Sequence, residues 1–404
     1  MVFFRISGAP EVLINHPDLV EEVMVAKQRS FTKARTLQEA RRVLGDGLLT
    51  SEGEVHLRHR RLIAPLFHQR VISEYGAQMV VLGEAHQRGW SEGASFDMTE
   101  HMAALTMAIV ARTVFAVDVT GDRREFGRAL SDVIEILSKR LIVPWGSALY
   151  RLPLPATRRF NRSRARLDAT IDQMLETRRE SGLQGNDLLS LLMSAVDDGD
   201  TLSDQDVRDE AMTVLLAGHE TTATWLSWTF AELAKHTDVA DAVRAEVRSV
   251  AGTRPLEVDD VPNLVVTDRV LREVLRLYPP VWMIGRRAHE DVQIGGRTIR
   301  AGTVAILSPW LMQRDERWFS DPERFAPDRW RDHPALPRFA FFPFGGGVRR
   351  CLGEGFSWME AKLLLGTLLR NWHFELVRPG PVVALPRITL RPRNGLPMVA
   401  RRVS

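Results

Sequence analysis

The chain has 404 residues, of which 45% are hydrophobic and 26% are charged, as is typical of a soluble globular protein with a large core. Its 54 lysines and arginines stand against 51 acidic residues, and this near balance argues against a general nucleic-acid binder. The single cysteine excludes an internal disulfide and indicates a reducing compartment. Because no apolar run approaches about 18 residues and the start lacks a signal-peptide pattern, we expect a cytoplasmic protein without a membrane anchor.

Hydrophobic periodicity predicts a mainly helical protein. A weakly alternating stretch over 3–15 predicts a β-hairpin, and a helix follows from about Pro17 to Gln28. Residues 29–52 are mixed, without a clear period. After them helical patterns dominate, and we expect helices over 55–68, 72–90, 97–116, 122–142, 156–181, 186–196, 204–235, 238–251 and 264–277.

In the last third of the chain the sequence pattern is no longer mainly helical. Short β runs occupy 281–306, and the segment 314–345 is rich in proline and aromatic residues with little periodicity. One long helix is expected to run to about Trp372, and the C-terminal end predicts a hairpin with its turn at 393–395. Strands do not alternate with helices, which argues against a doubly wound sheet. We therefore expect one mainly α domain with small β-sheets over residues 1–404.

The only cysteine, Cys351, stands in a distinctive setting. Three glycines (345–347) and two arginines (349–350) precede it, and a helical pattern follows. A thiol ahead of a helix N-terminus and beside arginines favours the thiolate, and glycines allow a close approach to a flat, bulky group. This setting suits a thiolate metal ligand. The alternative is that a lone cysteine is a small buried apolar residue.

The wider pattern resembles the haem-binding loop of the cytochrome P-450 family, with Phe344, Gly347, Arg349, Cys351 and Gly353 in the order Phe-x-x-Gly-x-Arg-x-Cys-x-Gly. The resemblance covers nearly the whole chain and implies the cytochrome P-450 fold, with haem b between a long distal helix and the cysteine loop. It implies that Cys351 is the thiolate ligand of the iron and that Phe344, Gly347 and Arg349 contact the haem. Family members usually begin with some tens of residues before the first hairpin, so this chain is expected to have a shortened N-terminal segment.

A second stretch, Ala217-Gly218-His219-Glu220-Thr221-Thr222, interrupts the pattern of the helix expected over 204–235. A threonine hydroxyl can bond to the carbonyl four residues earlier and bend a helix there, here Thr221 to Ala217. Taken alone, the stretch also fits a packed glycine beside an exposed glutamate. The resemblance implies that Ala217 lies at the haem and that Glu220 and Thr221 are the catalytic acid–alcohol pair that delivers protons to bound oxygen. We do not expect His219 to be a metal ligand.

The spacing Glu273-x-x-Arg276 places two opposite charges on one helical face, which by itself indicates a surface ion pair. In the family such a pair forms a buried structural triad with a later arginine. The resemblance assigns that role to Arg329, with Arg324 as the alternative. We expect the triad to brace the cysteine loop and to take no part in the chemistry.

Two carboxylates of a haem require cationic or hydrogen-bonding partners. By position the resemblance implies His56, Arg60, Arg286 and Arg349. Each of the arginines also fits a solvated surface residue. Their neighbours Arg61 and Arg287 are expected to point away. The arginines 58, 60, 61, 349 and 350 predict a basic face for an acidic electron donor.

The resemblance implies a monomeric haem-thiolate monooxygenase of secondary metabolism. It would hydroxylate or epoxidise a hydrophobic terpenoid, fatty acid or polyketide-like molecule with O2 and electrons from a ferredoxin or flavodoxin-type donor and its reductase. A peroxide-driven peroxygenase and a non-catalytic haem sensor or carrier are the alternatives. Family position places substrate contacts in 33–50, 137–160, 205–217, 281–285 and 388–395, and we single out Leu216, Val281, Met283 and Ile284.

Overall fold

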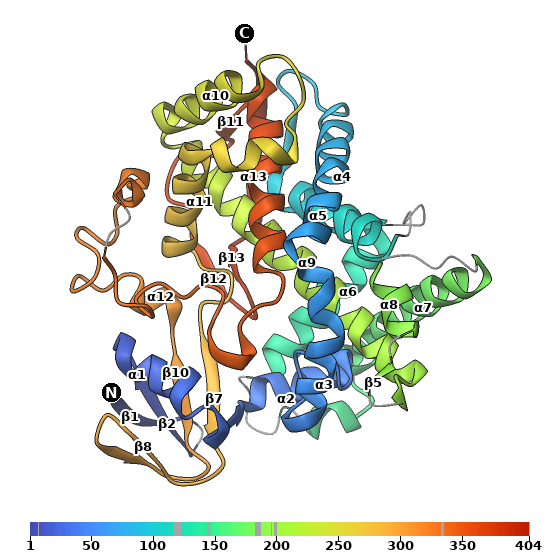
Figure 1. Cartoon of the computed structure of the whole chain (residues 1–404), viewed down its shortest axis with the longest axis vertical. Coiled ribbons are helices and arrows are strands. Elements are labelled where there is room, and N and C mark those ends of the chain that lie inside the picture. The colour runs from blue at the N-terminus through green and yellow to red at the C-terminus, as the bar shows by residue number, and fades with distance from the viewer. Residues whose placement is uncertain are drawn as a thin grey trace.

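The computed structural model has a helical body with a five-stranded sheet at one end (Figure 1). The structure describes residues 1–6, 8–116, 123–141, 143, 146, 148–181, 187–194, 196–197, 200–332 and 335–403. Residues 122, 142, 186 and 195, which the sequence predicts to be helical, lie outside this described part. The expected fold class, mainly α with small sheets, agrees with the architecture.

The central element is α9 (Asp204–Leu233), which crosses the middle of the helical body (Figure 1). Ser203 begins it with a capping box, because its hydroxyl accepts from the N–H of Asp206 while the Asp206 carboxylate accepts from the N–H of Ser203. Its second half is buried on every side. Both α5 (Met98–Thr113) and α13 (Glu354–Asn371) pack against it, so α9 is held from two directions.

Most of the remaining helices follow the predicted ranges, but the helix predicted from Pro17 to about Gln28 is an α-helix only to Glu21 and continues as a π-helix over Glu22–Ala26. Pro65 ends the helix predicted over 55–68 early, because proline has no N–H to continue the ladder, and a 3-10 turn over Ala64–Phe67 follows. A helix over Arg35–Leu44 was not predicted from the mixed segment 29–52. These helices are α1 (Pro17–Glu21), α2 (Arg35–Leu44), α3 (Gly53–Ile63), α4 (Gln69–Gln87), α6 (Arg123–Leu141), α7 (Pro155–Ser181), α8 (Leu188–Ser194), α10 (Thr237–Ala251), α11 (Val265–Leu277) and α12 (Pro309–Met312).

The larger sheet has the strand order β1-β2-β10-β7-β3. The predicted N-terminal hairpin is present, and its second strand pairs in parallel with a strand 293 residues later, with Leu307 opposite Ile14. The strands are β1 (Val2–Ile6), β2 (Ala9–Ile14), β3 (Phe31–Lys33), β7 (Ile284–Ala288) and β10 (Val304–Leu307), and the hairpin of β8 (Val292–Ile294) and β9 (Arg297–Ile299) lies between the last two in sequence.

The C-terminal hairpin predicted with its turn at 393–395 is wrong. The turn exists, and Asn394 and Gly395 both have positive φ, but its two flanking strands do not pair with each other. Instead β14 (Pro397–Arg402) lies between β11 (Trp372–Leu376) and β4 (Ser95–Asp97). The partner of β13 (Leu390–Pro392) is β12 (Ala384–Pro386), and a short hairpin joins β5 (Val196–Asp197) and β6 (Asp200–Thr201). Non-local pairing outweighed the local turn signal.

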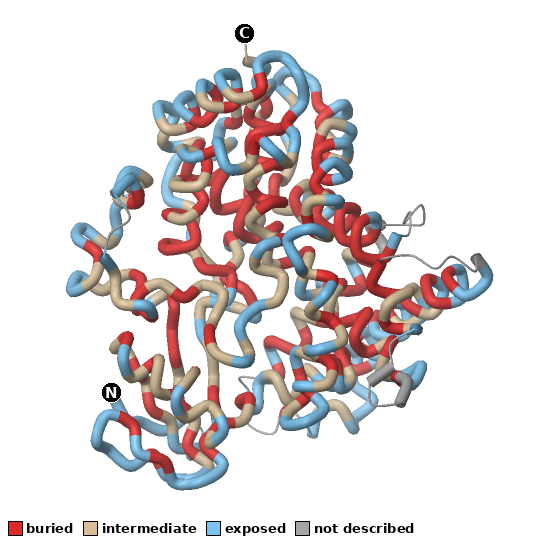
Figure 2. The backbone as a smooth tube through the Cα atoms, in the orientation of Figure 1, coloured by how far each residue is buried: buried red, intermediate tan, exposed pale blue. Residues whose placement is uncertain are grey.

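Buried residues form two apolar cores (Figure 2). The larger fills the space among α4, α5, α9, α11 and α13, and the smaller lies under the five-stranded sheet around Val12, Phe31 and Leu307. None of the helices in the described ranges is both long and apolar enough to cross a membrane.

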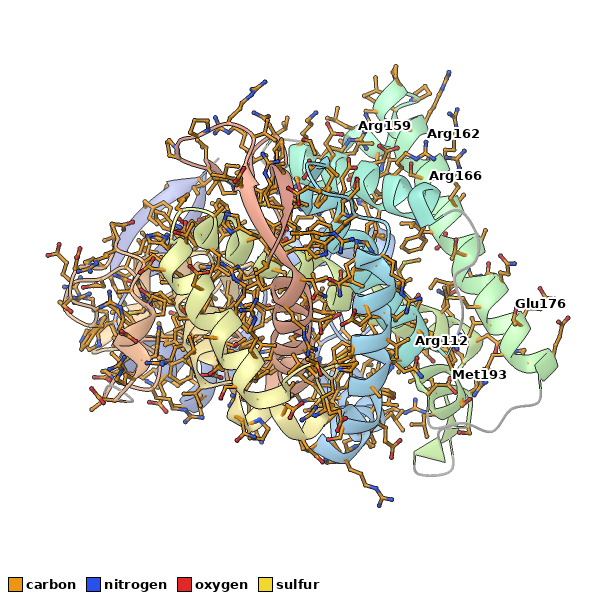
Figure 3. All side chains as sticks on the ribbon, turned by 90° about the horizontal axis from the view of Figure 1, so that it is seen from above. Arg112, Arg159, Arg162, Arg166, Glu176 and Met193 are labelled. Atoms are coloured by element: carbon orange, nitrogen blue, oxygen red, sulfur yellow. The ribbon has the colours of Figure 1, made fainter. Side chains whose placement is uncertain are left out.

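The helix α7 is strongly basic on its outer side. Figure 3 shows Arg159, Arg162 and Arg166 projecting from it. The guanidinium of Arg159 pairs with both Asp132 and Glu135 of α6 at 2.6 Å. These exposed pairs contribute little to stability, so α7 owes its position to its buried apolar face.

Candidate active site

The cysteine loop is packed tightly against the N-terminal part of the chain. Gly347 has φ +66°, and a Cβ there would lie 1.9 Å from the carbonyl oxygen of Met24. Only glycine fits at this position. The N–H of Cys351 donates to the carbonyl of Phe344 at 3.0 Å and closes the loop, and α13 begins at Glu354, three residues after the cysteine. The loop geometry therefore follows from the glycines that the sequence pattern contains.

Cys351 keeps accessible surface, although protein atoms crowd its sulfur closely enough to desolvate it. Burial raises the pKa of the Cys351 thiol to about 11, and the Gly353 N–H with Arg60 and Arg350 opposes this rise only in part. The N–H groups at the helix terminus and the arginines favour the thiolate, as expected, but burial outweighs them. A metal ion bound at this sulfur would favour its deprotonated form.

A second accessible position lies inside α9. Ala217 is exposed although Leu215 and His219 beside it are buried. The Phe344 ring of the cysteine loop meets the Trp225 ring of α9 edge to face at 6.3 Å between centroids. The cysteine loop and α9 are thus in contact, and each has one small accessible residue.

Three cations gather where β3 and β7 pair. Lys33 stands opposite Arg286 in the strand register, and the charge of Arg349 acts on both. Desolvation lowers the pKa of Arg286 to about 10 and that of Lys33 to about 7. The carboxylate that joins this group is Glu52, which accepts from Arg349 at 2.6 Å and from the N–H of Lys33. Arg287 is exposed, as strand alternation requires.

This group matches the needs of a haem. Arg286 and Arg349, with Lys33 partly protonated near pH 7, face the carboxylate of Glu52 and the charge of Glu210, and a dianionic ligand would favour the charged form of all three basic groups. Within the described part of the chain, His56 Nε2 and Arg349 Nε are buried without a hydrogen-bond partner. Burial lowers the pKa of His56 to about 4, and its Nδ1 bonds to the Leu48 carbonyl at 3.1 Å, so Nε2 could donate to a carboxylate only after the ring takes up a second proton. Lys33, His56, Arg286 and Arg349 therefore fit two propionates.

Lys33 and Glu52 were missed from the sequence. The one available signal was a lysine two residues after Phe31, on the same side of the short strand Phe31–Lys33. The buried ammonium of Lys33 donates to the carbonyls of Leu48 and Ser51. Arg60, predicted as a propionate partner, donates from one guanidinium nitrogen to the carbonyl of Arg350 at 2.8 Å, beside the cysteine. Arg60 and Arg350 thus bring α3 and the cysteine loop together on one basic side.

A haem also fits the metal chemistry. Among the residues that the structure describes, no group of three or more His, Cys, Asp or Glu is arranged to hold a metal ion. One thiolate alone holds an iron when a porphyrin supplies the other in-plane ligands.

The predicted acid–alcohol residues have different partners in the structure. The hydroxyl of Thr221 donates to the carbonyl of Ala217 at 2.8 Å, within a helix that stays continuous. The carboxylate of Glu220 turns the other way, toward Thr389 and Arg391. His219 is buried, and desolvation lowers its pKa, so it is a neutral packed residue.

One buried acid in this region was not predicted. Glu360 of α13 is 0% exposed, and burial raises its pKa well above the ordinary value. Neither carboxyl oxygen has a hydrogen bond of ordinary geometry within the described chain, although the Thr222 hydroxyl lies near enough to oppose the rise in pKa. Glu360 is therefore a neutral acid between α13 and α9.

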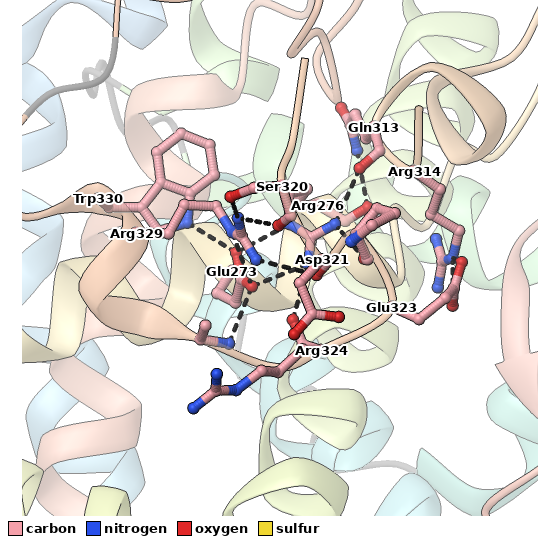
Figure 4. A network of polar contacts seen from close by, with 12 residues as sticks. Glu273, Arg276, Gln313, Arg314, Ser320, Asp321, Glu323, Arg324, Arg329 and Trp330 are labelled. Atoms are coloured by element: carbon pink, nitrogen blue, oxygen red, sulfur yellow. Dashed lines mark hydrogen bonds and ion pairs between the residues drawn. The ribbon is translucent and has the colours of Figure 1, made fainter. Parts of the chain in front are cut away.

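The predicted triad is assembled as a buried network (Figure 4). Glu273 accepts from Arg276 at 2.8 and 2.9 Å and from the Arg329 Nε at 3.3 Å. The Trp330 ring N–H also donates to Glu273. Arg324, the alternative third member, contributes only its backbone carbonyl, which accepts from Arg276 at 3.0 Å.

The four residues predicted to contact substrate differ in how exposed they are. Val281 and Met283 are each 37% exposed, whereas Leu216 and Ile284 are half-buried. The ring N–H of Trp282 donates to the carbonyl of Arg387 at 2.8 Å and ties this segment to the turn of the β12–β13 hairpin. Residues 142, 144, 145 and 147 of the predicted substrate segments lie outside the described residues.

Comparison with known proteins gives a consistent result. Residues 1–396 match the family model described as Cytochrome P450. The chain is 37% identical to the cyclooctatin synthase of Streptomyces melanosporofaciens, covering 99% of this chain and 86% of that protein. It is 37% identical to the cyclooctat-9-en-7-ol 5-monooxygenase of the same organism over 99% of this chain and 87% of the relative. The pentalenene oxygenase of Streptomyces avermitilis is 33% identical over 99% and 90% of the two chains.

The fold is also similar to that of a solved structure. A crystal structure described as the cytochrome P450DA heme domain superimposes with a TM-score of 0.89 and 27% sequence identity. The match covers all of this chain and 90% of that one.

Proposed function

We propose, from the premise that this chain belongs to the cytochrome P-450 family and is a monooxygenase that uses haem b, that its substrate is a polycyclic terpenoid. Three relatives that match almost the whole chain are named for cyclooctatin, cyclooctat-9-en-7-ol and pentalenene, which are polycyclic terpenoids. These names favour a terpenoid over a fatty acid or a polyketide. The structural observation that supports a haem site is the cysteine loop together with the nearby group of buried cations.

The residues of this chain would hold the cofactor in two places. Cys351 would bind the iron, and Lys33, His56, Arg286 and Arg349 would bind the propionates. Bound haem supplies the activation of O2, one atom of which enters the substrate while the other leaves as water. The hydroxyl of Thr221, one helical turn from the accessible Ala217, would hold a proton at Oγ1 for that oxygen.

The proposed substrate contacts are apolar. Leu216, Val281, Met283 and Ile284 carry no charge, and a pocket lined in this way favours a hydrocarbon skeleton with few polar groups. Such a substrate is held by burial of apolar surface, so orientation depends on the shape of the pocket more than on hydrogen bonds.

The protein works with an electron donor, as monooxygenases of this family do. We propose an acidic ferredoxin or flavodoxin, which would meet the basic side formed by Arg60 and Arg350. We also propose that this protein is a monomer and is located in the cytoplasm. The single cysteine supports a reducing compartment.

The substrate class is tested with the purified holoenzyme by its Soret spectrum. Pentalenene, a long-chain fatty acid and a macrolide aglycone are titrated separately, and displacement of water from the haem is read as a high-spin shift. We expect the largest and tightest response with the terpenoid. A tighter response to the fatty acid or the macrolide would refute the terpenoid assignment.

A further inference from the structure

Three aromatic rings meet beside the cysteine loop. The rings of Trp225 on α9 and Trp358 on α13 are nearly perpendicular, with 4.9 Å between their centroids. The Phe344 ring lies 6.3 Å from each of them, which is within the usual range for rings in contact. The carbonyl of Phe344 also accepts from the N–H of Cys351 at 3.0 Å. A path of one hydrogen bond and three rings therefore leads from the cysteine to α13.

The two tryptophans differ in their contact with water. Trp225 is 2% exposed, and its ring N–H donates to the carbonyl of Leu271 at 3.1 Å. Trp358 is half-buried and keeps accessible surface. The aromatic path thus begins in the interior, at the cysteine loop, and ends at the surface, at Trp358.

Two cations flank the outer ring of this path. The guanidinium carbon of Arg272 lies 4.9 Å from the centroid of the Trp358 ring, and Lys362 Nζ lies 5.8 Å from it. The carboxylate of Asp268 holds both cations in place, at 2.5 Å from Arg272 and 2.8 Å from Lys362. Two cations with one carboxylate leave an excess of positive charge beside the ring, which attracts an anionic molecule.

The surroundings of the two indoles would direct a single-electron oxidation outward. Tryptophan is one of the few side chains that can lose one electron to a strong oxidant, and a haem that reacts with peroxide supplies such an oxidant. An oxidised Trp225 keeps its ring proton, because its partner is a backbone carbonyl and that group is only a hydrogen-bond acceptor. It therefore stays strongly oxidising and draws an electron from the neighbouring Trp358.

The electron deficiency is expected to stop at Trp358. The charges of Arg272 and Lys362 disfavour a further positive charge on the ring between them. An oxidised Trp358 therefore releases its ring proton to water and becomes a neutral radical. This radical lies where a molecule in solution can return the missing electron.

We propose that Trp225 and Trp358 form a one-electron relay from the haem site to the surface, and that Trp358 is a second oxidation site, for anionic, electron-rich aromatic molecules that never enter the substrate pocket. Hydrogen peroxide is the oxidant: it takes up two electrons and two protons and leaves as two molecules of water. Each electron comes from one molecule of the aromatic reductant, which becomes a radical, and passes through Trp358 and then Trp225. This activity is independent of the terpenoid assignment.

The test uses the holoenzyme, hydrogen peroxide and the dye ABTS, a sulfonated aromatic anion whose one-electron oxidation is read by its colour. Trp358→Phe keeps an aromatic ring but removes the oxidisable one, and Trp358→Tyr introduces a different oxidisable ring. Trp310→Phe is the control, because Trp310 is also half-buried and has Arg314 at 4.5 Å from its ring centroid. The spectrum of the reduced carbon-monoxide complex confirms that each variant keeps its haem site.

Samples frozen directly after mixing with peroxide should show a tryptophan radical by paramagnetic resonance, and a spin trap should label the wild-type protein at Trp358 in peptide maps. In Trp358→Phe we expect the label at this position to be lost and ABTS oxidation to slow by about tenfold or more, while the terpenoid Kd stays within about twofold. Trp358→Tyr should restore much of the rate with a tyrosyl signal, and Trp310→Phe should match the wild type. Lys362→Gln should raise the KM for ABTS and leave kcat nearly unchanged.

Two results would overturn the proposal. If Trp358→Phe oxidises ABTS at the wild-type rate, the dye receives its electrons elsewhere and the three rings only pack together. If the spin trap labels the wild-type protein at other residues and not at Trp358, the relay does not end there, and this second result holds even where a variant fails to bind haem. An unchanged KM in Lys362→Gln would refute the preference for anionic reductants.

Discussion

Removing the carboxylate of Glu273 should destabilise the protein more than any other change in its network. Glu273 and Arg276 are both 0% exposed and share two hydrogen bonds, and the backbone N–H of Ala326 and the ring N–H of Trp330 also donate to Glu273 (Figure 4). In Glu273→Ala the guanidinium of Arg276 would stay buried without its counter-charge. The expected loss in the free energy of unfolding is about 3–5 kcal/mol, as is found when one partner of a buried pair is removed.

The contacts of the three arginines in the network explain the size of this loss in the free energy of unfolding. Arg276 keeps three carbonyl partners, those of Gln313, Pro322 and Arg324, which is why the loss does not approach the cost of a fully isolated charge. Arg329 is 11% exposed and meets Glu273 at 3.3 Å, so Arg329→Ala should cost about 1–2 kcal/mol. Arg324→Ala should change stability by less than about 0.5 kcal/mol, because only its backbone participates.

Urea unfolding of the holoenzyme, followed by tryptophan fluorescence and by the Soret band, measures these losses. The order of destabilisation should be Glu273→Ala, then Arg329→Ala, then Arg324→Ala, with the Soret band lost at lower urea in the first variant. If Glu273→Ala unfolds at the same urea concentration as Arg324→Ala, the network does not brace the fold and the reasoning is refuted. If Arg324→Ala costs more than Arg329→Ala, the third member has been assigned to the wrong arginine.

Three further changes test the site. Cys351→Ala should abolish the red-shifted Soret band of the reduced carbon-monoxide complex, and a retained band would exclude the thiolate ligand. Thr221→Ala should leave reductant consumption within about threefold while hydrogen peroxide replaces product, and unchanged coupling would remove Thr221 from the route. Glu360 is protonated when folded and ionised when unfolded above pH 4.5, so stability should fall by up to about 1.4 kcal/mol per pH unit above that value. Glu360→Gln should flatten that slope in urea titrations at pH 5, 6 and 7, and an unchanged slope would show that Glu360 is ionised in the folded protein.

Much of the site could be predicted because its signals are local. The glycines before Cys351 serve a loop that closes within eight residues, between Phe344 and Cys351. Strand alternation separates Arg286 from Arg287, and helical spacing places Glu273 beside Arg276. Each of these relations acts over a few residues, so periodicity and turn chemistry are enough to reveal it.

Other features depend on segments that meet only in the folded chain. The pairing of β14 with β11 and β4 outweighed the Asn394-Gly395 turn, and Lys33 joined the cation group because β3 pairs with β7. The direction of the Glu220 carboxylate was decided by a hairpin about 170 residues away, whose side chains offer two hydrogen bonds and an ion pair.

The sequence by itself determined the family and the fold class, and it predicted the thiolate position and the residues that can carry protons, because these are properties of residue types at short spacings. Only the tertiary structure decided the charge environment of each group. Burial raised the pKa of Cys351 where local reasoning predicted a lower one, since desolvation sums over all neighbours and local charges are a small part of them.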